Sequence, residues 1–237
     1  MLTPRDRLIV ALDVSSAAAA RKIVAAVGES VSTFKVGMQL YTAEGPGLVR
    51  ELVAAGRKVF LDLKYHDIPN TVASAVKEAA GLGVSMLTVH AGGGSKMLRG
   101  AVEAAAANPS LIVLAVSVLT SMDEDDLHEI SVQGSVEKQV LSLGKLALDA
   151  GCQGLVSSAK EAPALRKSYG EKFALITPGV RPAGVEHGDQ ARVVTPAQAV
   201  QAGASHIVVG RPITGAANPQ QAAKNIIDEI PTEVSSR

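Results

Sequence analysis

The sequence predicts a (β/α)8 TIM barrel, in which eight parallel strands alternate with eight helices. Short runs rich in Val, Ile and Leu recur along the chain, and an Ala-rich segment with helical spacing follows each of them. Strict alternation of this kind implies a parallel sheet. The chain has 237 residues, and eight such units in about 240 residues imply that the sheet closes. An open, doubly wound sheet is the alternative.

Strands are expected over residues 8–12, 33–37, 58–63, 85–90, 111–116, 154–157, 173–177 and 206–210. Helices are expected over residues 17–27, 47–55, 72–82, 96–107, 136–150, 161–169, 196–201 and 220–230. The chain contains no linker, low-complexity tract or shift in composition. We therefore expect residues 1–237 to form a single domain.

Composition limits the range of functions. The 23 basic and 23 acidic residues give a net charge of zero, so no general field attracts nucleic acid or an anionic membrane, and neither is an expected partner. Cys152 is the single cysteine, which excludes an internal disulfide and suits a reducing compartment. The apolar run before Asp13 is too short for a signal peptide or a membrane span. A cytoplasmic protein is expected.

Two charged residues follow an apolar strand. Asp62 and Lys64 come directly after residues 59–61, and the alternation of a strand places both on the face that carries Phe60, with α-carbons roughly 6–7 Å apart. Buried charges need a paired network, a solvent-filled opening or a ligand. An ion pair with only a structural role is one interpretation, and an active site is the other.

Other polar residues fall at the ends of the expected strands: Asp13, Lys35, Thr120, Gly210 and Arg211. In a (β/α)8 barrel the carboxyl ends of the strands meet at one face, where the chemistry takes place. Individually, each has an ordinary explanation, since Asp13 could lead into a capped helix and Lys35 could extend to the rim. Together on one face, they predict an active site.

The long polar segment 179–192 follows the seventh expected strand and carries Arg181 and Gln190. Loops of this length usually act as lids or binding loops. The loops after strands seven and eight of such barrels commonly bind phosphate. Gly210 allows a close approach of the backbone, and the guanidinium of Arg211 offers a forked donor. The pattern predicts a phosphate site, although a surface arginine would explain Arg211 alone.

A metal site is a further possibility, because His66 and His90 could join Asp62 and Asp67 in binding zinc or a harder cation. However, Lys35 and Lys64 would place two ammonium groups at the same opening, where they oppose a divalent cation. We expect no metal and interpret His90 as a hydrogen-bonded wall residue.

The segment from Asp62 to Thr71 resembles the Asp-x-Lys-x-x-Asp-Ile-x-x-Thr signature of the orotidine 5′-phosphate decarboxylase family. The resemblance extends over nearly the whole chain. Further matches to family motifs lie, in order, at Leu12-Asp13, Lys35-Val36-Gly37, Ser117-Val118-Leu119-Thr120, Thr177-Pro178-Gly179-Val180-Arg181 and Val209-Gly210-Arg211-Pro212. The charged positions show no departure from the family pattern.

The resemblance implies a homodimer with shared active sites and no cofactor, which converts orotidine 5′-phosphate into UMP. It implies that Lys64 is the catalytic acid, flanked by Asp62 and by an Asp67 from the neighbouring subunit. Ile68 and Thr71 are likewise expected to extend into the partner's site.

The family pattern also assigns the substrate contacts. Lys35 is expected to complete the alternating charged network of catalytic residues and, with Asp13, to bind the ribose hydroxyls. Thr120 is expected to contact the pyrimidine. The phosphate is expected to be held by Arg181, Gln190, Gly210 and Arg211.

Two alternatives remain. A 3-keto-L-gulonate 6-phosphate decarboxylase shares the Asp-x-Lys-x-x-Asp pattern but uses magnesium, and that family has a metal-binding Glu where this chain has Lys35. A non-catalytic barrel that binds nucleotide phosphates would keep the phosphate residues without needing Lys64 between two carboxylates. Turnover of orotidine 5′-phosphate in the presence of EDTA separates these possibilities.

Overall fold

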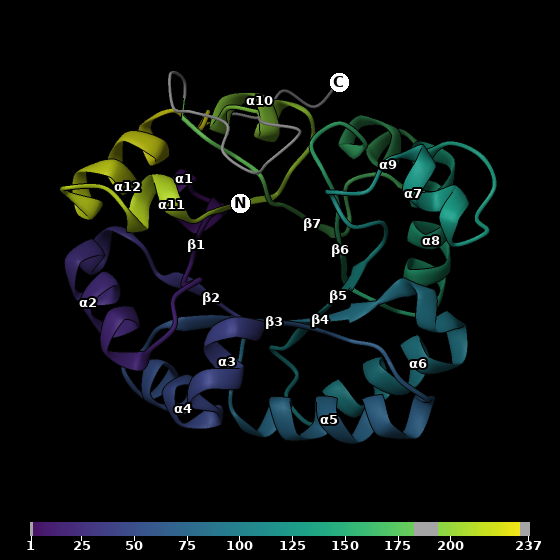
Figure 1. The fold of residues 1–237 in the computed structure, drawn as a ribbon, viewed down its shortest axis with the longest axis horizontal. Helices are drawn as coiled ribbons and strands as arrows, with labels where there is room; N and C mark the ends of the chain where they lie inside the picture. The colour runs from purple at the N-terminus through teal and green to yellow at the C-terminus, as the bar shows by residue number, and fades with distance from the viewer. Residues whose placement is uncertain (1, 183–193, 233–237) are drawn as a thin grey trace.

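A computed structural model of the chain describes residues 2–182 and 194–232. The eight expected strands are present and pair in sequence order as one closed parallel barrel, which confirms the (β/α)8 prediction and excludes the open doubly wound sheet. Figure 1 shows the strands as a ring surrounded by helices. The strands are β1 (Leu8–Ala11), β2 (Thr33–Gly37), β3 (Lys58–Tyr65), β4 (Met86–His90), β5 (Ile112–Val116), β6 (Gly154–Val156), β7 (Ala174–Thr177) and β8 (His206–Val209).

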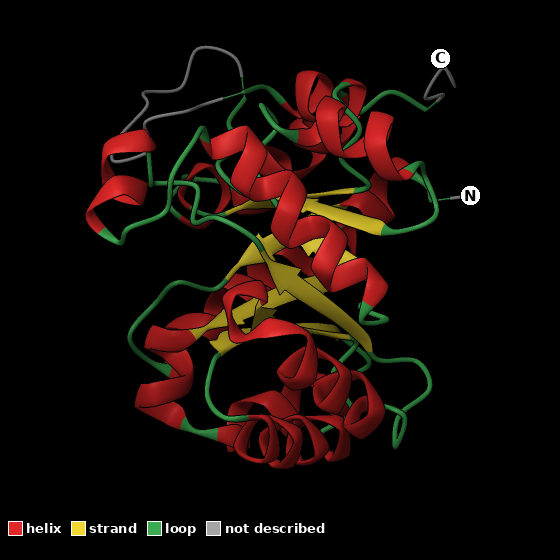
Figure 2. Ribbon diagram, turned by 90° about the vertical axis from the view of Figure 1, so that its right-hand side faces the viewer, coloured by secondary structure: helices red, strands yellow, loops and turns green. Residues whose placement is uncertain are grey.

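All eight expected helices are present, and they lie outside the strands (Figure 2). They are α2 (Ala17–Val27), α4 (Pro46–Ala54), α5 (Pro69–Gly81), α6 (Gly94–Ala105), α8 (Val136–Asp149), α9 (Ala162–Tyr169), α10 (Pro196–Gln201) and α12 (Pro219–Asp228). Four of them begin earlier than expected, one at Gly94 and three at a proline: Pro46, Pro69 and Pro219. Proline suits the first turn of a helix, because an N–H there has no partner within the helix.

The structure also contains several short segments that were not predicted from the sequence: α1 (Pro4–Arg7), α3 (Met38–Glu44), α7 (Glu124–Glu129), α11 (Arg211–Thr214), and the 3-10 turns η1 (Gly28–Ser30) and η2 (Ala91–Gly93). These segments are too short to show a helical period. Two of them are marked by capping boxes, one between Thr3 and Asp6 and one between Asp123 and Asp126. None of the helices in the described ranges is long and apolar enough to cross a membrane.

The strands are buried on both sides, as in other parallel barrels, and all four residues of β1 are inaccessible or nearly so. One apolar cluster packs between the strands and the helices. A smaller cluster fills the inside of the barrel and consists of Ile9, Ala11, Phe60, Met86, Leu114, Ile176 and Val208. Gly154 is required for this closure, because a Cβ atom there would lie 2.5 Å from the carbonyl oxygen of Ala174. The interior is therefore a packed core and not a pore.

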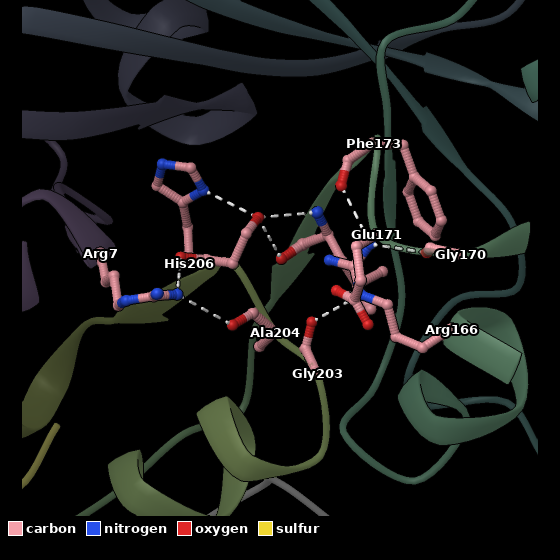
Figure 3. Close-up of polar contacts among 10 residues, drawn as sticks. Arg7, Arg166, Gly170, Glu171, Phe173, Gly203, Ala204 and His206 are labelled. Atoms are coloured by element: carbon pink, nitrogen blue, oxygen red, sulfur yellow. Dashed lines mark hydrogen bonds and ion pairs between the residues drawn. The ribbon is translucent and has the colours of Figure 1, made fainter. Parts of the chain in front are cut away.

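Side chains at the amino-terminal end of the barrel hold the segments that enter β7 and β8 (Figure 3). Arg166 donates hydrogen bonds to the carbonyls of Gly203, at 2.9 Å, and Phe173, at 3.0 Å. Ser205 contacts Leu175 twice, since its hydroxyl accepts from the backbone N–H at 2.8 Å and lies 3.1 Å from the carbonyl oxygen. These contacts satisfy backbone groups of β7 and of the segments that lead into β7 and β8, at the end opposite the expected active site.

His206, the first residue of β8, packs into this end of the barrel. Its Nδ1 lies 3.1 Å from the hydroxyl of Ser205, and the residue is 7% exposed. Burial, with a smaller contribution from the positive charge of Arg7, lowers the pKa of His206 from 6.5 to about 4. The imidazole is therefore neutral in the folded protein over a pH range in which the unfolded chain binds a proton.

We expect the stability of the fold to decrease as the pH falls from about 6.5 to about 4. The unfolded chain takes up a proton at His206 in this range and the folded chain does not, which removes up to about 3 kcal/mol of unfolding free energy. Urea unfolding of His206→Asn across this range should give a shallower pH dependence than the native chain. His128→Asn, at an exposed position, is the matched control. Equal slopes for His206→Asn and the native chain would contradict the assignment.

Candidate active site

A cavity of about 470 Å³ opens at the carboxyl ends of the strands. Its volume is typical of small-molecule sites. It is lined by Ala11 and Asp13 after β1, Lys35 of β2, Phe60, Asp62 and Lys64 of β3, Val116, Val118, Leu119 and Thr120 around the end of β5, Val156 of β6, Ile176, Pro178, Gly179, Val180 and Arg181 around β7, and Val208, Gly210, Arg211, Pro212 and Thr214 around β8. Eight of the residues predicted from the sequence thus lie on one cavity: Asp13, Lys35, Asp62, Lys64, Thr120, Arg181, Gly210 and Arg211.

Four charged side chains form a row of alternating sign across β1, β2 and β3. Lys35 Nζ donates to Asp13 Oδ1 at 2.8 Å and lies 3.6 Å from Asp62 Oδ2, and Lys64 Nζ donates to Asp62 Oδ1 at 3.0 Å. The side chains of Lys35 and Asp62 are only 12% and 14% exposed. A single carboxylate therefore holds two ammonium groups in a partly dehydrated opening, where Coulomb interactions are stronger than in bulk water.

Glycine leaves the space that this row needs. A Cβ atom on Gly37 would lie 3.0 Å from Lys35 Nζ and 3.2 Å from Asp13 Oδ1. Both distances are shorter than an unstrained contact, so the residue at the end of β2 must be small for the Lys35–Asp13 pair to keep its geometry.

The end of β3 departs from the regular strand that the sequence predicted. Leu61 pairs with Leu87 and Tyr65 pairs with Val89, so three residues of β3 face a single residue of β4. Lys64 has a φ of 49°, in the left-handed region that side chains other than glycine rarely adopt. The prediction that Asp62 and Lys64 share one face with Phe60 is nevertheless confirmed, since all three line the cavity and Lys64 Nζ lies 3.0 Å from Asp62 Oδ1. What the sequence did not predict is the bulge and the left-handed backbone at Lys64.

Arg181 and Arg211 line the cavity after β7 and β8. Arg181 is 7% exposed, and its Nε has no hydrogen-bond partner among the described residues. Burial lowers the pKa of Arg181, and the positive charge of Arg211 lowers it further. Two guanidinium groups that repel each other in a cavity are well placed to receive an anion. Gln190 lies outside the described residues.

Asp67, Ile68 and Thr71 do not line this cavity. They lie on the loop after β3 and at the start of α5, and all three are exposed to solvent. Asp67 Oδ1 accepts a hydrogen bond from the N–H of Ile68 at 2.6 Å, and Ile68 is 67% exposed. Within one chain, these three residues are therefore not brought to the charged row.

His66 and His90 stack face to face, with ring centroids 5.0 Å apart. His90 Nδ1 accepts a hydrogen bond from the N–H of Gly92 at 3.1 Å, but His90 does not line the cavity, so its interpretation as a wall residue is not supported. Burial lowers the pKa of His90, with smaller contributions from His66 and Lys64. No group of three or more His, Cys, Asp or Glu side chains within residues 2–182 and 194–232 could hold a metal ion.

The sequence analysis missed two kinds of site residue. The first is the apolar lining, which includes Phe60, Val118 and Val208 and resembles ordinary strand sequence. The second is Thr88, a buried residue whose hydroxyl donates a hydrogen bond to Asp62 Oδ1. Its signal was available in principle: a single polar residue stands between Met86 and His90 on the inward-facing positions of an apolar strand.

The fold and cavity define a (β/α)8 barrel with a charged candidate active site at the carboxyl ends of its strands, where enzymes of this fold carry their catalytic groups. The sequence model of the orotidine 5′-phosphate decarboxylase / HUMPS family matches residues 6–226. The chain belongs to this family.

Individual relatives agree over almost the full length. The chain is 48% identical over 233 residues to orotidine 5′-phosphate decarboxylase of Moorella thermoacetica, which covers 95% of this chain and 92% of the relative. It is 51% identical over 225 residues to the enzyme of the same name from Halorhodospira halophila, with 94% and 95% covered.

Solved structures show the same similarity. The crystal structure of orotidine 5′-phosphate decarboxylase from Lactobacillus acidophilus superposes with a TM-score of 0.85 at 40% identity, covering 94% of this chain and 97% of the other. An uncharacterized conserved protein from Geobacillus kaustophilus superposes with a TM-score of 0.81 at 35% identity, covering 94% and 99%.

Proposed function

We propose that this chain converts orotidine 5′-phosphate into UMP and CO2 in de novo pyrimidine biosynthesis, with Lys64 as the proton donor. The observation that carries the proposal is the alternating charged row, in which Asp62 lies 3.0 Å from Lys64 and 3.6 Å from Lys35 in the cavity. Membership of the orotidine 5′-phosphate decarboxylase / HUMPS family and the names of the relatives support the same substrate.

The chemistry explains why fixed charge is needed. When the bond between C6 and the carboxylate breaks, the electron pair stays on C6, where no adjacent carbonyl or iminium group can delocalise it. The ammonium group of Lys64 stabilises this negative charge and then donates a proton to C6, which gives UMP. Lys64 recovers its proton from solvent. We propose that the reaction uses no cofactor.

The other groups of the row orient the substrate. In this proposal Asp62 lies near the departing carboxylate and fixes the Lys64 ammonium, with which it shares a 3.0 Å contact. Asp13 and Lys35 bind the ribose hydroxyls, and Thr120, on the cavity wall after β5, contacts the pyrimidine. Holding the substrate against preorganised charges removes the reorganisation that water would require.

The phosphate is proposed to bind Arg181, Arg211 and the backbone at Gly210, with Gln190 as a further contact. The buried, partly unpartnered guanidinium of Arg181 and its repulsion by Arg211 support an anion at this position. Phosphate contacts far from C6 supply binding energy that is used in the transition state.

We further propose a cytoplasmic homodimer with shared active sites. Asp67, Ile68 and Thr71 carry the family signature but are exposed and lie away from the cavity of their own chain. A two-fold dimer would let this loop reach the partner's site. The partner subunit would then cover the apolar side chain of Ile68, which is exposed in a single chain.

The function is tested by turnover of orotidine 5′-phosphate in the presence of EDTA, with Lys64→Ala as the decisive variant. We expect the native chain to release CO2 with EDTA present. Removing the stabilising charge and the proton donor should lower kcat at least about 10³-fold. Lys58→Ala, at the exposed opposite end of the same strand, should remain fully active. Inhibition by EDTA would favour the magnesium-dependent alternative, and UMP binding without turnover would favour the non-catalytic barrel.

Arg181→Ala separates phosphate binding from the chemical step. We expect it to weaken the use of orotidine 5′-phosphate by about 1.5–3 kcal/mol, the value of a charge-assisted hydrogen bond. The effect on the phosphate-free nucleoside should be far smaller. Arg50→Ala, on the exposed face of α4, controls for the loss of a surface charge. Equal losses for both substrates would remove Arg181 from the phosphate site.

The shared site is tested by mixing two inactive homodimers, Lys64→Ala and Asp67→Ala. In a mixed dimer one site collects both substitutions and the other collects neither. Random reassortment of equal amounts gives about half mixed dimers, and hence about a quarter of the native number of intact sites. We expect activity to return when the two variants are unfolded and refolded together, but not when each is refolded alone. If mixed dimers form and remain inactive, Asp67 acts within its own subunit.

A further inference from the structure

Thr88 lies in the middle of β4 and is completely buried. Its hydroxyl accepts a hydrogen bond from the backbone N–H of Lys64 at 2.9 Å and donates one to Asp62 Oδ1 at 3.0 Å. Asp62 Oδ1 is also the oxygen that accepts from Lys64 Nζ at 3.0 Å. One hydroxyl thus links the backbone of Lys64 to the carboxylate that holds the Lys64 ammonium.

The position of Thr88 in the sheet explains why a side chain is needed there. Leu87 and Val89 pair with Leu61 and Tyr65, so Thr88 stands opposite the bulge of β3. At a bulge the regular ladder is interrupted and backbone groups lose their usual partners. Here the Lys64 N–H finds its partner in a threonine side chain, which satisfies a donor that would be costly to bury alone.

The same contact opposes the strain at Lys64. A φ of 49° at a residue other than glycine persists only where its surroundings hold it in place. Thr88 does not line the cavity, so it does not contact a bound substrate directly. Any effect on the reaction must pass through Lys64 and Asp62.

We propose that Thr88 is a positioning residue: its hydroxyl fixes the left-handed backbone of Lys64 and the orientation of the Asp62 carboxylate, and so sets the position of the ammonium group that protonates C6. This inference rests on the proposed function. The role requires a group that accepts and donates at one atom, which serine can reproduce, cysteine can reproduce weakly and valine cannot.

We expect Thr88→Val, which keeps the shape of the side chain, to lower kcat by about 10- to 100-fold, because both hydrogen bonds are lost and the Lys64 N–H is left without a partner. The affinity for UMP should stay within about threefold of the native value, since the phosphate contacts are intact. Thr88→Ser should restore kcat to within about threefold, and Thr88→Cys should lie between the two. Turnover assays measure kcat, titration measures the affinity for UMP, and thermal melting measures the melting temperature of each variant.

Thr33→Val is the matched control, because Thr33 is a buried threonine at the amino-terminal end of β2, away from the cavity and separated from β4 by β3. It should leave kcat unchanged. Turnover by the native chain tests the proposed function separately, so a failure of that function is distinguished from a failure of this inference. If Thr88→Val does not fold, a lower kcat for Thr88→Cys than for Thr88→Ser at equal UMP affinity supports the inference. Native kcat in Thr88→Val or Thr88→Cys, or parallel losses of kcat, UMP affinity and melting temperature in every variant including serine, would overturn it.

Discussion

The candidate active site depends on the Asp62 carboxylate, which lies 3.0 Å from the Lys64 ammonium and 3.6 Å from the Lys35 ammonium. Two positive groups in a cavity of limited solvent access would repel each other without it. The barrel makes the arrangement possible, because parallel pairing places Lys35 beside Phe60 and Gly37 beside Asp62 on the adjacent strand. Asp13 then extends the row from the end of β1. Alternating charge across three neighbouring strands is thus a direct result of register.

Several local features at the carboxyl ends of the strands lower the stability of the fold but shape the candidate active site. Lys64 adopts a left-handed backbone conformation. Position 37 is a glycine, which leaves room for the Lys35–Asp13 pair. Arg181 is buried, and its Nε has no hydrogen-bond partner among the described residues. Such features persist only where the surrounding structure is rigid enough to hold them. The closed sheet supplies that rigidity, since each of the strands β1 to β8 is paired on both sides.

The two ends of the barrel divide these tasks. At the amino-terminal end, Arg166 and Ser205 satisfy backbone groups around β7 and β8, and His206 is neutral and packed. At the carboxyl end, polar groups point into a cavity and carry the charge that the proposed decarboxylation requires. Stability and activity therefore rest on different residues, as expected for this fold.

The sequence by itself determined the order of strands and helices, the closure of the barrel and the set of polar residues at one face, because the periods of apolar residues and the turn signals between them are local properties. The charged residues at the strand ends also predicted an active site, and Arg181 in the segment after the seventh strand predicted a phosphate site. Only the tertiary structure showed the bulge at the end of β3 and the left-handed backbone of Lys64, since a regular strand was expected there. It also revealed Thr88, and it placed Asp67 and Ile68 outside the cavity of their own chain. These outcomes depend on pairing between strands that are distant along the chain, and a local pattern carries no information about such pairing.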